Sequence, residues 1–141
     1  MALNKIICGV TFLFFTATII GCEPNTATEE QDLTAEQLPG YWEVTQAIRD
    51  KKPTTTLEDA YFEFGAEKVA KLNVDGRDQT GTYELKDKIV EISGTSMDGK
   101  YKILQLQNDS MRLSVSKDIR GFVYNFVFNM IKTTPPVEKN E

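Results

Sequence analysis

The sequence contains no histidine and only two cysteines, Cys8 and Cys22. Without histidine, Ser-His-Asp and Cys-His nucleophile systems and imidazole-based zinc sites are excluded. Acidic residues outnumber basic ones, 21 to 16, and the lysines are dispersed among the acids. A clustered basic face, which nucleic acid would need, is therefore not expected. We predict no nucleic-acid partner, no metal site and no cofactor.

Carboxylates, lysines, tyrosines and hydroxyls remain as possible catalytic groups. A glycosidase would need two carboxylic acids held about 5 to 10 Å apart in a cleft. No acidic pair in this sequence stands out from the ordinary alternation of solvent-facing residues. We therefore predict no catalytic residues and no enzymatic activity.

The N-terminus has the three parts of an export signal. Lys5 gives a weakly positive start, Ile6–Ile20 is apolar, and the small residue Gly21 precedes Cys22. An apolar run of about 15 residues is short for a membrane-spanning helix, which needs roughly 20. Plain secretion, which would leave Cys22 as an unpaired thiol, and an uncut membrane anchor are the alternatives.

The segment that ends in Gly21-Cys22 resembles the lipobox of bacterial lipoproteins. The resemblance implies that a diacylglycerol is attached to the Cys22 thiol, that the chain is cut after Gly21, and that the new amino group is acylated. Several acyl chains on one residue give stable membrane attachment. We expect a lipid-anchored protein of the cell envelope, in the outer membrane of a Gram-negative bacterium, with the inner membrane as the alternative.

The chain divides into four parts. Residues 1–21 are the signal peptide, and residues 22–33 are the lipidated cysteine and a polar tether with few residues that could bury surface. Residues 34–132 form one domain, and residues 133–141, which include two consecutive prolines, form a disordered tail. Without the signal and its Lys5, 16 − 1 = 15 basic residues face 21 acidic ones, so the mature chain is mildly acidic, with a net charge of −6.

Apolar residues recur with a period of two along nearly the whole domain, which is typical of strands with one solvated face. About eight strands are expected, and the runs are Tyr41–Val44, Ala60–Phe64, Ala70–Val74, Thr82–Lys86, Lys88–Ile92, Leu104–Leu106, Met111–Val115 and Phe122–Met130. The only helix expected is one turn at Thr34–Gln37, which Pro39-Gly40 ends.

Turn residues separate these runs at Asp75-Gly76, Asp98-Gly99 and Asn108-Asp109. Links this short force neighbouring strands to be antiparallel. We predict an all-β fold, a small antiparallel up-and-down barrel, because closure removes exposed sheet edges. A sandwich is the main competitor, and Asp50–Leu57 is long and polar enough to be a crossover or a lid loop.

Leu38–Trp42 resembles the Gly-x-Trp start of lipocalins, and together with Tyr61–Phe64 and Gly81–Leu85 it resembles the lipocalin-like domains found in bacterial lipoproteins. The resemblance covers roughly Leu38 to Lys132. It implies that Trp42, which follows Gly40 by two positions, packs across the closed end of the barrel beneath a basic residue after the last strand. Lys132 occupies that position, where lipocalins usually have arginine. The plain alternative for Trp42 is an ordinary core tryptophan.

Five aromatic residues are candidates for lining a ligand site inside the barrel: Phe62, Phe64, Tyr83, Phe126 and Phe128. A barrel of about eight strands can either fill its interior with side chains or hold one small ligand. Two functions follow. The protein binds a small apolar or lipid-like ligand in its interior, or its filled barrel is a non-enzymatic module that docks an envelope protein or has a structural role.

Overall fold

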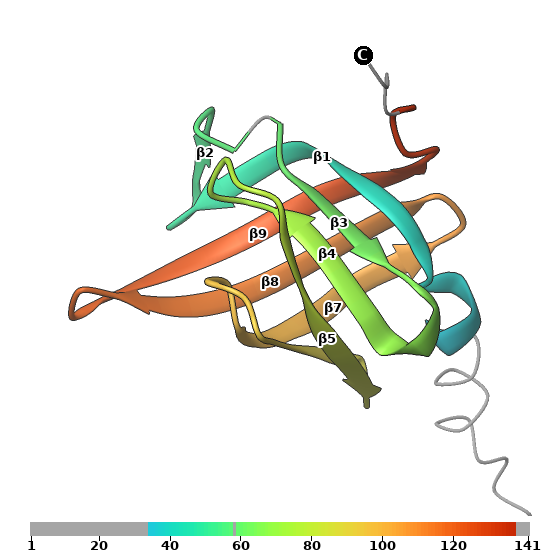
Figure 1. Ribbon diagram of the computed structural model, residues 1–141. Helices are drawn as coiled ribbons and strands as arrows, with labels where there is room; N and C mark the ends of the chain where they lie inside the picture. Colours follow the sequence, from blue (N-terminus) through green and yellow to red (C-terminus); the bar gives the residue numbers. More distant parts are fainter. Residues whose placement is uncertain (1–33, 58, 138–141) are drawn as a thin grey trace, which may run out of the picture.

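The structure is a computed structural model that describes residues 34–57 and 59–137. Residues 34–37 form one helical turn, as expected, and a single antiparallel sheet of nine strands follows (Figure 1). The elements are β1 (Gly40–Arg49), β2 (Lys52–Thr54), β3 (Tyr61–Phe64), the 3-10 turn η1 (Ala66–Lys68), β4 (Val69–Asn73), β5 (Gln79–Lys86), β6 (Ile89–Ser93), β7 (Gly99–Gln107), β8 (Ser110–Ile119) and β9 (Phe122–Thr133).

The sheet closes on itself because the first long strand pairs with the last. β1 pairs with β9 along its length, from Tyr41 opposite Thr133 to Arg49 opposite Phe126. Strands β3 to β9 follow one another in sequence order, so eight strands form a closed up-and-down barrel. The predicted fold class is confirmed, and the sandwich alternative is wrong.

The interpretation of Asp50–Leu57 as a crossover or lid loop is wrong. Its central residues form β2, which pairs with the last residues of β1, while β3 pairs with the first residues of the same β1 edge. Asp50 and Lys51 both have positive φ, 49° and 68°, which is the conformation of a two-residue hairpin turn whose twist matches the strands. The segment therefore turns back locally.

The core lies inside the barrel and extends from Leu38 to Met130. Within the barrel strands buried residues alternate with more exposed ones, as in β6, where Val90 and Ile92 are buried and their neighbours exposed. The barrel is closed and the buried core residues described lie between Leu38 and Met130, so a chain that starts at residue 23 includes all of them.

Two irregularities interrupt the alternation. The register between β7 and β8 shifts between Ile103 and Gln105, and that between β1 and β9 shifts between Val44 and Gln46. At the first shift Ile103 is buried but Leu104 is 46% exposed. The bulge shifts the apolar alternation from Tyr101 and Ile103 to Leu104 and Leu106, and the sequence pattern predicted only the second part, whereas β7 begins at Gly99.

The longest strand is β9, with 12 residues, and its hairpin with β8 extends beyond the rest of the barrel (Figure 1). The pairing between them continues to Ile119 opposite Phe122, while β1 ends at Arg49, opposite Phe126. The outermost residues of the hairpin therefore have no neighbouring strand beyond their own partner. This projecting end, residues 117–124, is called the hairpin tip below.

Candidate functional site

The structure brings Trp42, Gly40 and Lys132 together at the end of the barrel where β1 begins. Trp42 is fully buried, and its indole Nε1 donates a hydrogen bond of 2.8 Å to the Leu38 carbonyl. The Lys132 ammonium lies 4.9 Å from the centroid of the Trp42 ring and donates to the Gln37 carbonyl at 2.7 Å. Lys132 therefore connects the last strand to the helical turn that covers this end.

Glycine is favoured at position 40 by its φ of +140°. A Cβ there would also lie 2.8 Å from Cε of Lys132, so the lysine side chain would have to shift. Because Gly40 has no side chain, the aliphatic part of Lys132 can pass over it and place the ammonium above the ring of Trp42, two residues further on. The role of Gly40, Trp42 and Lys132 at this end of the barrel is therefore one of packing.

The five candidate ligand-lining residues all lie in the buried core, where they contact one another. Phe62 packs edge-on against Phe128 at 5.3 Å between ring centroids, and Phe64 packs edge-on against Tyr83 at 5.0 Å. Phe126 stacks on Phe128 at 6.1 Å. All five side chains are at most 8% exposed. Together they form a buried aromatic cluster.

Tyr101 is a member of this cluster that the sequence analysis missed. Its ring is fully buried and contacts Phe62 at 5.8 Å, and its hydroxyl donates to the Met97 carbonyl at 2.7 Å. Burial raises the pKa of the hydroxyl, and the negative charge of Asp98 adds to the shift. The alternation of Tyr101 and Ile103 with two lysines would have been the signal, but the bulge interrupts the pattern directly afterwards.

Several hollows are lined by residues on the outer surface of the barrel. One of about 590 Å³ is lined by Tyr41 and Tyr61, whose rings stack at 4.9 Å, together with Pro135 and Pro136. Burial and a hydrogen bond to Asp78 raise the pKa of Tyr61 to about 12. None of these hollows is lined by one of the five candidate rings.

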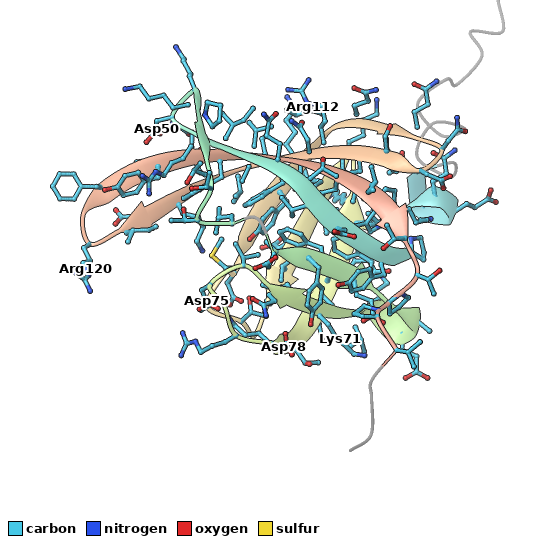
Figure 2. The ribbon with its side chains drawn as sticks, turned by 90° about the horizontal axis from the view of Figure 1, so that it is seen from above. Asp50, Lys71, Asp75, Asp78, Arg112 and Arg120 are labelled. Atoms are coloured by element: carbon cyan, nitrogen blue, oxygen red, sulfur yellow. The ribbon has the colours of Figure 1, made fainter. Side chains whose placement is uncertain are left out.

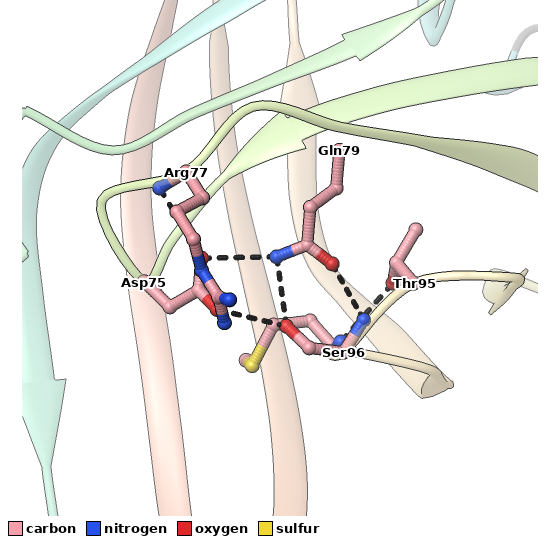
Figure 3. A network of polar contacts seen from close by, with 6 residues as sticks. Asp75, Arg77, Gln79, Thr95 and Ser96 are labelled. Atoms are coloured by element: carbon pink, nitrogen blue, oxygen red, sulfur yellow. Dashed lines mark hydrogen bonds and ion pairs between the residues drawn. The ribbon is translucent and has the colours of Figure 1, made fainter.

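At the opposite end of the barrel a polar network ties the β4–β5 turn to the β6–β7 turn (Figure 3). Both carboxylate oxygens of Asp75 accept hydrogen bonds, from Gln79 at 2.9 Å and from Ser96 at 3.0 Å, and Arg77 forms an ion pair at 2.8 Å. The side-chain amide oxygen of Gln79 accepts from the Ser96 backbone N–H. Arg77 is the main reason that the pKa of Asp75 is lowered. The network braces two turns.

The hairpin tip carries the two most exposed large apolar side chains of the described strands. These are Phe122, 67% exposed, and Val123, 65% exposed, and Ile119 beside them is 44% exposed. Ile119 pairs with Phe122, so their side chains share the hairpin face that continues from buried Phe126, while Val123 lies on the other face. Figure 2 shows Arg120 at the far end of this projection, away from Asp75 and Asp78.

Several residues of the lipoprotein prediction, Gly21 and Cys22 among them, lie outside the described part of the chain, as does the whole tether. Within residues 34–57 and 59–137 no helix is both long and apolar enough to cross a membrane. The same residues include no group of three or more acidic, cysteine or histidine residues placed to hold a metal ion.

No protein-family model matches the chain, and no curated protein is similar to it at a significant level. The fold is an eight-stranded antiparallel barrel with a buried aromatic cluster.

Proposed function

We propose that the protein is a lipid-anchored, non-enzymatic module of the cell envelope that acts through the outside of a filled barrel. The observation that carries the proposal is the buried aromatic cluster. The rings expected to line a ligand site pack against one another instead, with Phe62 in contact with Phe64, Tyr101 and Phe128. Protein interiors packed in this way accept no extra group without displacing side chains.

The lipid anchor is supported by the sequence alone, through Ile19-Ile20-Gly21-Cys22 after a short apolar run. A Cys22→Ser variant of the full chain tests it in a Gram-negative host. The variant is expected to stay uncut and to take up no fatty-acid label, while the parent chain is labelled and shortened. Label that persists in the variant contradicts the anchor. Fractionation of the labelled parent chain then distinguishes the outer from the inner membrane.

Carriage of a small apolar or lipid-like ligand is the other function that the sequence allows. It requires that Phe126 and Phe128, which stack at 6.1 Å, move apart from their neighbours. Burial of apolar ligand area yields about 25 cal/mol per Å², but part of this would be spent in separating rings that already bury each other. The packing therefore favours a module that acts through its surface.

A titration with a fluorescent long-chain fatty acid separates these two functions. Residues 23–141 contain the whole barrel and are expected to show no saturable binding. A Phe62→Ala variant, which opens space among the rings, is the positive control for the assay. Saturable binding to the parent that Phe126→Trp weakens by filling the interior would contradict the filled-barrel proposal and support the ligand carrier.

A further inference from the structure

We propose that the hairpin tip inserts into the surface of a lipid bilayer that contains anionic lipids. This inference deepens the proposed function, because it names the partner of a barrel that acts through its outside. Three observations carry it: the projection of the hairpin, apolar side chains on both of its faces, and a local excess of basic residues. None of them depends on residues 1–33.

The first observation is the shape of the tip together with its exposure. Beyond the end of β1 the hairpin is a two-stranded ribbon, and such ribbons bury little surface of their own. Phe122 is nevertheless 67% exposed. The aromatic residues of β9 form one row that runs from fully buried Phe128 through half-buried Tyr124 to this exposed ring. The apolar stripe of the core thus continues into solvent.

The second observation selects the kind of partner. Ile119 and Phe122 lie on one face of the ribbon, and Val123 lies on the other. A partner protein that covers one face of the hairpin would leave Val123 in water. The acyl region beneath lipid headgroups surrounds an inserted tip on all sides, so it covers both faces at once. Apolar side chains that enter this boundary region are a recurrent means of attachment for peripheral proteins.

The third observation is charge. Around the tip and the adjoining β1–β2 turn there are five basic residues and two acidic ones, so this region is positive in a chain whose net charge is −5. These residues are Arg49, Lys51, Lys52, Lys117 and Arg120, with Asp50 and Asp118.

The two carboxylates are engaged by the backbone, since Asp50 accepts from the Asn125 N–H and Asp118 from the Gly121 N–H. Lys117 contacts the carbonyl of a third acid, Asp98, whose own carboxylate accepts from Thr95. With Asp98 included, five basic residues face three acidic ones, and the region remains positive.

Of the remaining bases, Arg49 lies over the ring of Tyr124, at 5.8 Å from its centroid. Lys51, Lys52 and Arg120 have no ion-pair partner among the described residues. Basic side chains behind an apolar tip are attracted by anionic headgroups, and this attraction falls off within a Debye length. The charge of the tip therefore fits a negatively charged surface and opposes close approach of a second copy.

The lipid anchor and the tip can reach the same bilayer. Residues 22–33 can span about 40 Å when fully extended, at about 3.3–3.6 Å per residue. The 12 residues of β9 have a similar length at about 3.3 Å per residue. Insertion of the tip would then hold the barrel along the membrane surface.

The test is flotation of residues 23–141 with vesicles of phosphatidylcholine alone or mixed with about one third phosphatidylglycerol. The parent is expected to float with the anionic vesicles and to be released as salt is raised. A Phe122→Ser/Val123→Ser variant should bind at least tenfold more weakly, and Lys51→Ser/Lys52→Ser several-fold more weakly. Leu104→Ser is the matched control, because it removes an apolar side chain that is 46% exposed on another strand. It should leave binding unchanged.

A Phe122→Trp variant reports the position of the tip directly. Its fluorescence should shift to the blue with anionic vesicles and be quenched by brominated acyl chains, whereas the buried Trp42 contributes a constant background. All the substituted residues are exposed, so unchanged urea midpoints will show that the variants are folded.

Three outcomes overturn the proposal: no flotation with anionic vesicles, equal loss with Leu104→Ser, or a dimer in sedimentation that the Phe122→Ser/Val123→Ser variant abolishes. The last outcome would assign the tip to a second copy of the chain. The fatty-acid titration tests the filled barrel separately. If the barrel binds neither fatty acid nor vesicles, the proposed function stands and only the membrane contact of the hairpin tip is contradicted.

Discussion

A Cβ on Gly81 would lie 2.2 Å from the carbonyl oxygen of Ser93, which is too close for any side chain. Gly81 lies in β5 and Ser93 ends β6, where the two strands enter the braced turns at the end of the barrel. The neighbouring Thr95 methyl would also lie within 2.8 Å of the Cβ. The glycine at this position therefore permits a close approach of two backbones.

Gly81→Ala is expected to lower the free energy of unfolding by about 1–3 kcal/mol, because backbone atoms must move to admit the methyl group. Gly65→Ala is the matched control, since a Cβ there would meet its nearest atom, the Val69 carbonyl oxygen, at an ordinary 3.5 Å. Urea unfolding of both variants measures the difference. Equal effects would show that the strands do not approach as described.

The closed end of the barrel leads to a second prediction. Trp42→Ala should cost about 3–5 kcal/mol in the free energy of unfolding, because the fully buried ring leaves a cavity and the Leu38 carbonyl loses its donor. Lys132→Ala should cost less, about 1 kcal/mol, since it removes a cation–π contact and one hydrogen bond at a half-buried position.

Lys102→Ala, at an exposed position of β7, serves as the control for loss of a lysine and should change stability by less than about 0.5 kcal/mol. If Lys132→Ala behaves like this control in urea unfolding, the lysine does not secure the closed end of the barrel.

Alternation predicted the barrel strands because each buries one face, and this signal is local. It failed for β2, since Lys52-Pro53-Thr54 contains no apolar alternation and pairs only with the end of β1. It also shortened β7, because the bulge between Ile103 and Gln105 shifts the apolar alternation from Tyr101 and Ile103 to Leu104 and Leu106. The first error comes from tertiary pairing, which a local pattern does not contain, and the second comes from a change of phase within one strand.

The candidate residues at the closed end, Gly40, Trp42 and Lys132, could be named because Leu38–Trp42 resembles the start of lipocalins. The state of the interior could not, because it depends on how eight strands of particular lengths bring Phe62, Tyr101 and Phe128 into contact. The hairpin tip was also hidden in the sequence. Phe122 and Phe126 lie on the same face of β9. Phe126 is buried and Phe122 is exposed because β1 ends at Arg49, opposite Phe126, and does not reach Phe122.

The polar network at the braced turns makes a prediction about acidity. Arg77 is the largest cause of the lowered pKa of Asp75, followed among the favourable contacts by hydrogen bonds from Ser96 and Gln79. Arg77→Ala should therefore raise this pKa toward its ordinary value by more than Ser96→Ala does. Carbon-13 NMR titration of the Asp75 carboxyl measures both changes. A larger effect of Ser96→Ala would mean that the ion pair at 2.8 Å is not formed in solution.

Tyr101 makes the stability of the barrel sensitive to alkaline pH. Burial raises the pKa of its hydroxyl in the folded protein, whereas in the unfolded chain the pKa is about 10. Above pH 10 the unfolded chain therefore releases a proton that the folded protein retains, and the free energy of unfolding falls with pH. The contribution is fully present below pH 10 and decreases by about 1.4 kcal/mol for each pH unit above it, up to the folded-state pKa. Tyr61, whose pKa is about 12, adds to the same loss.

Tyr101→Phe removes this titration. At pH 8 the variant should be less stable than the parent by about 1 kcal/mol, because the 2.7 Å hydrogen bond to the Met97 carbonyl is lost. Between pH 10 and pH 11.5 its stability should decline less steeply, so the difference shrinks and then reverses. Urea unfolding at fixed pH values from 8 to 11.5 measures both slopes. Parallel slopes would show that the Tyr101 hydroxyl ionises as readily in the barrel as in water, which its burial among Phe62 and the other core rings does not permit.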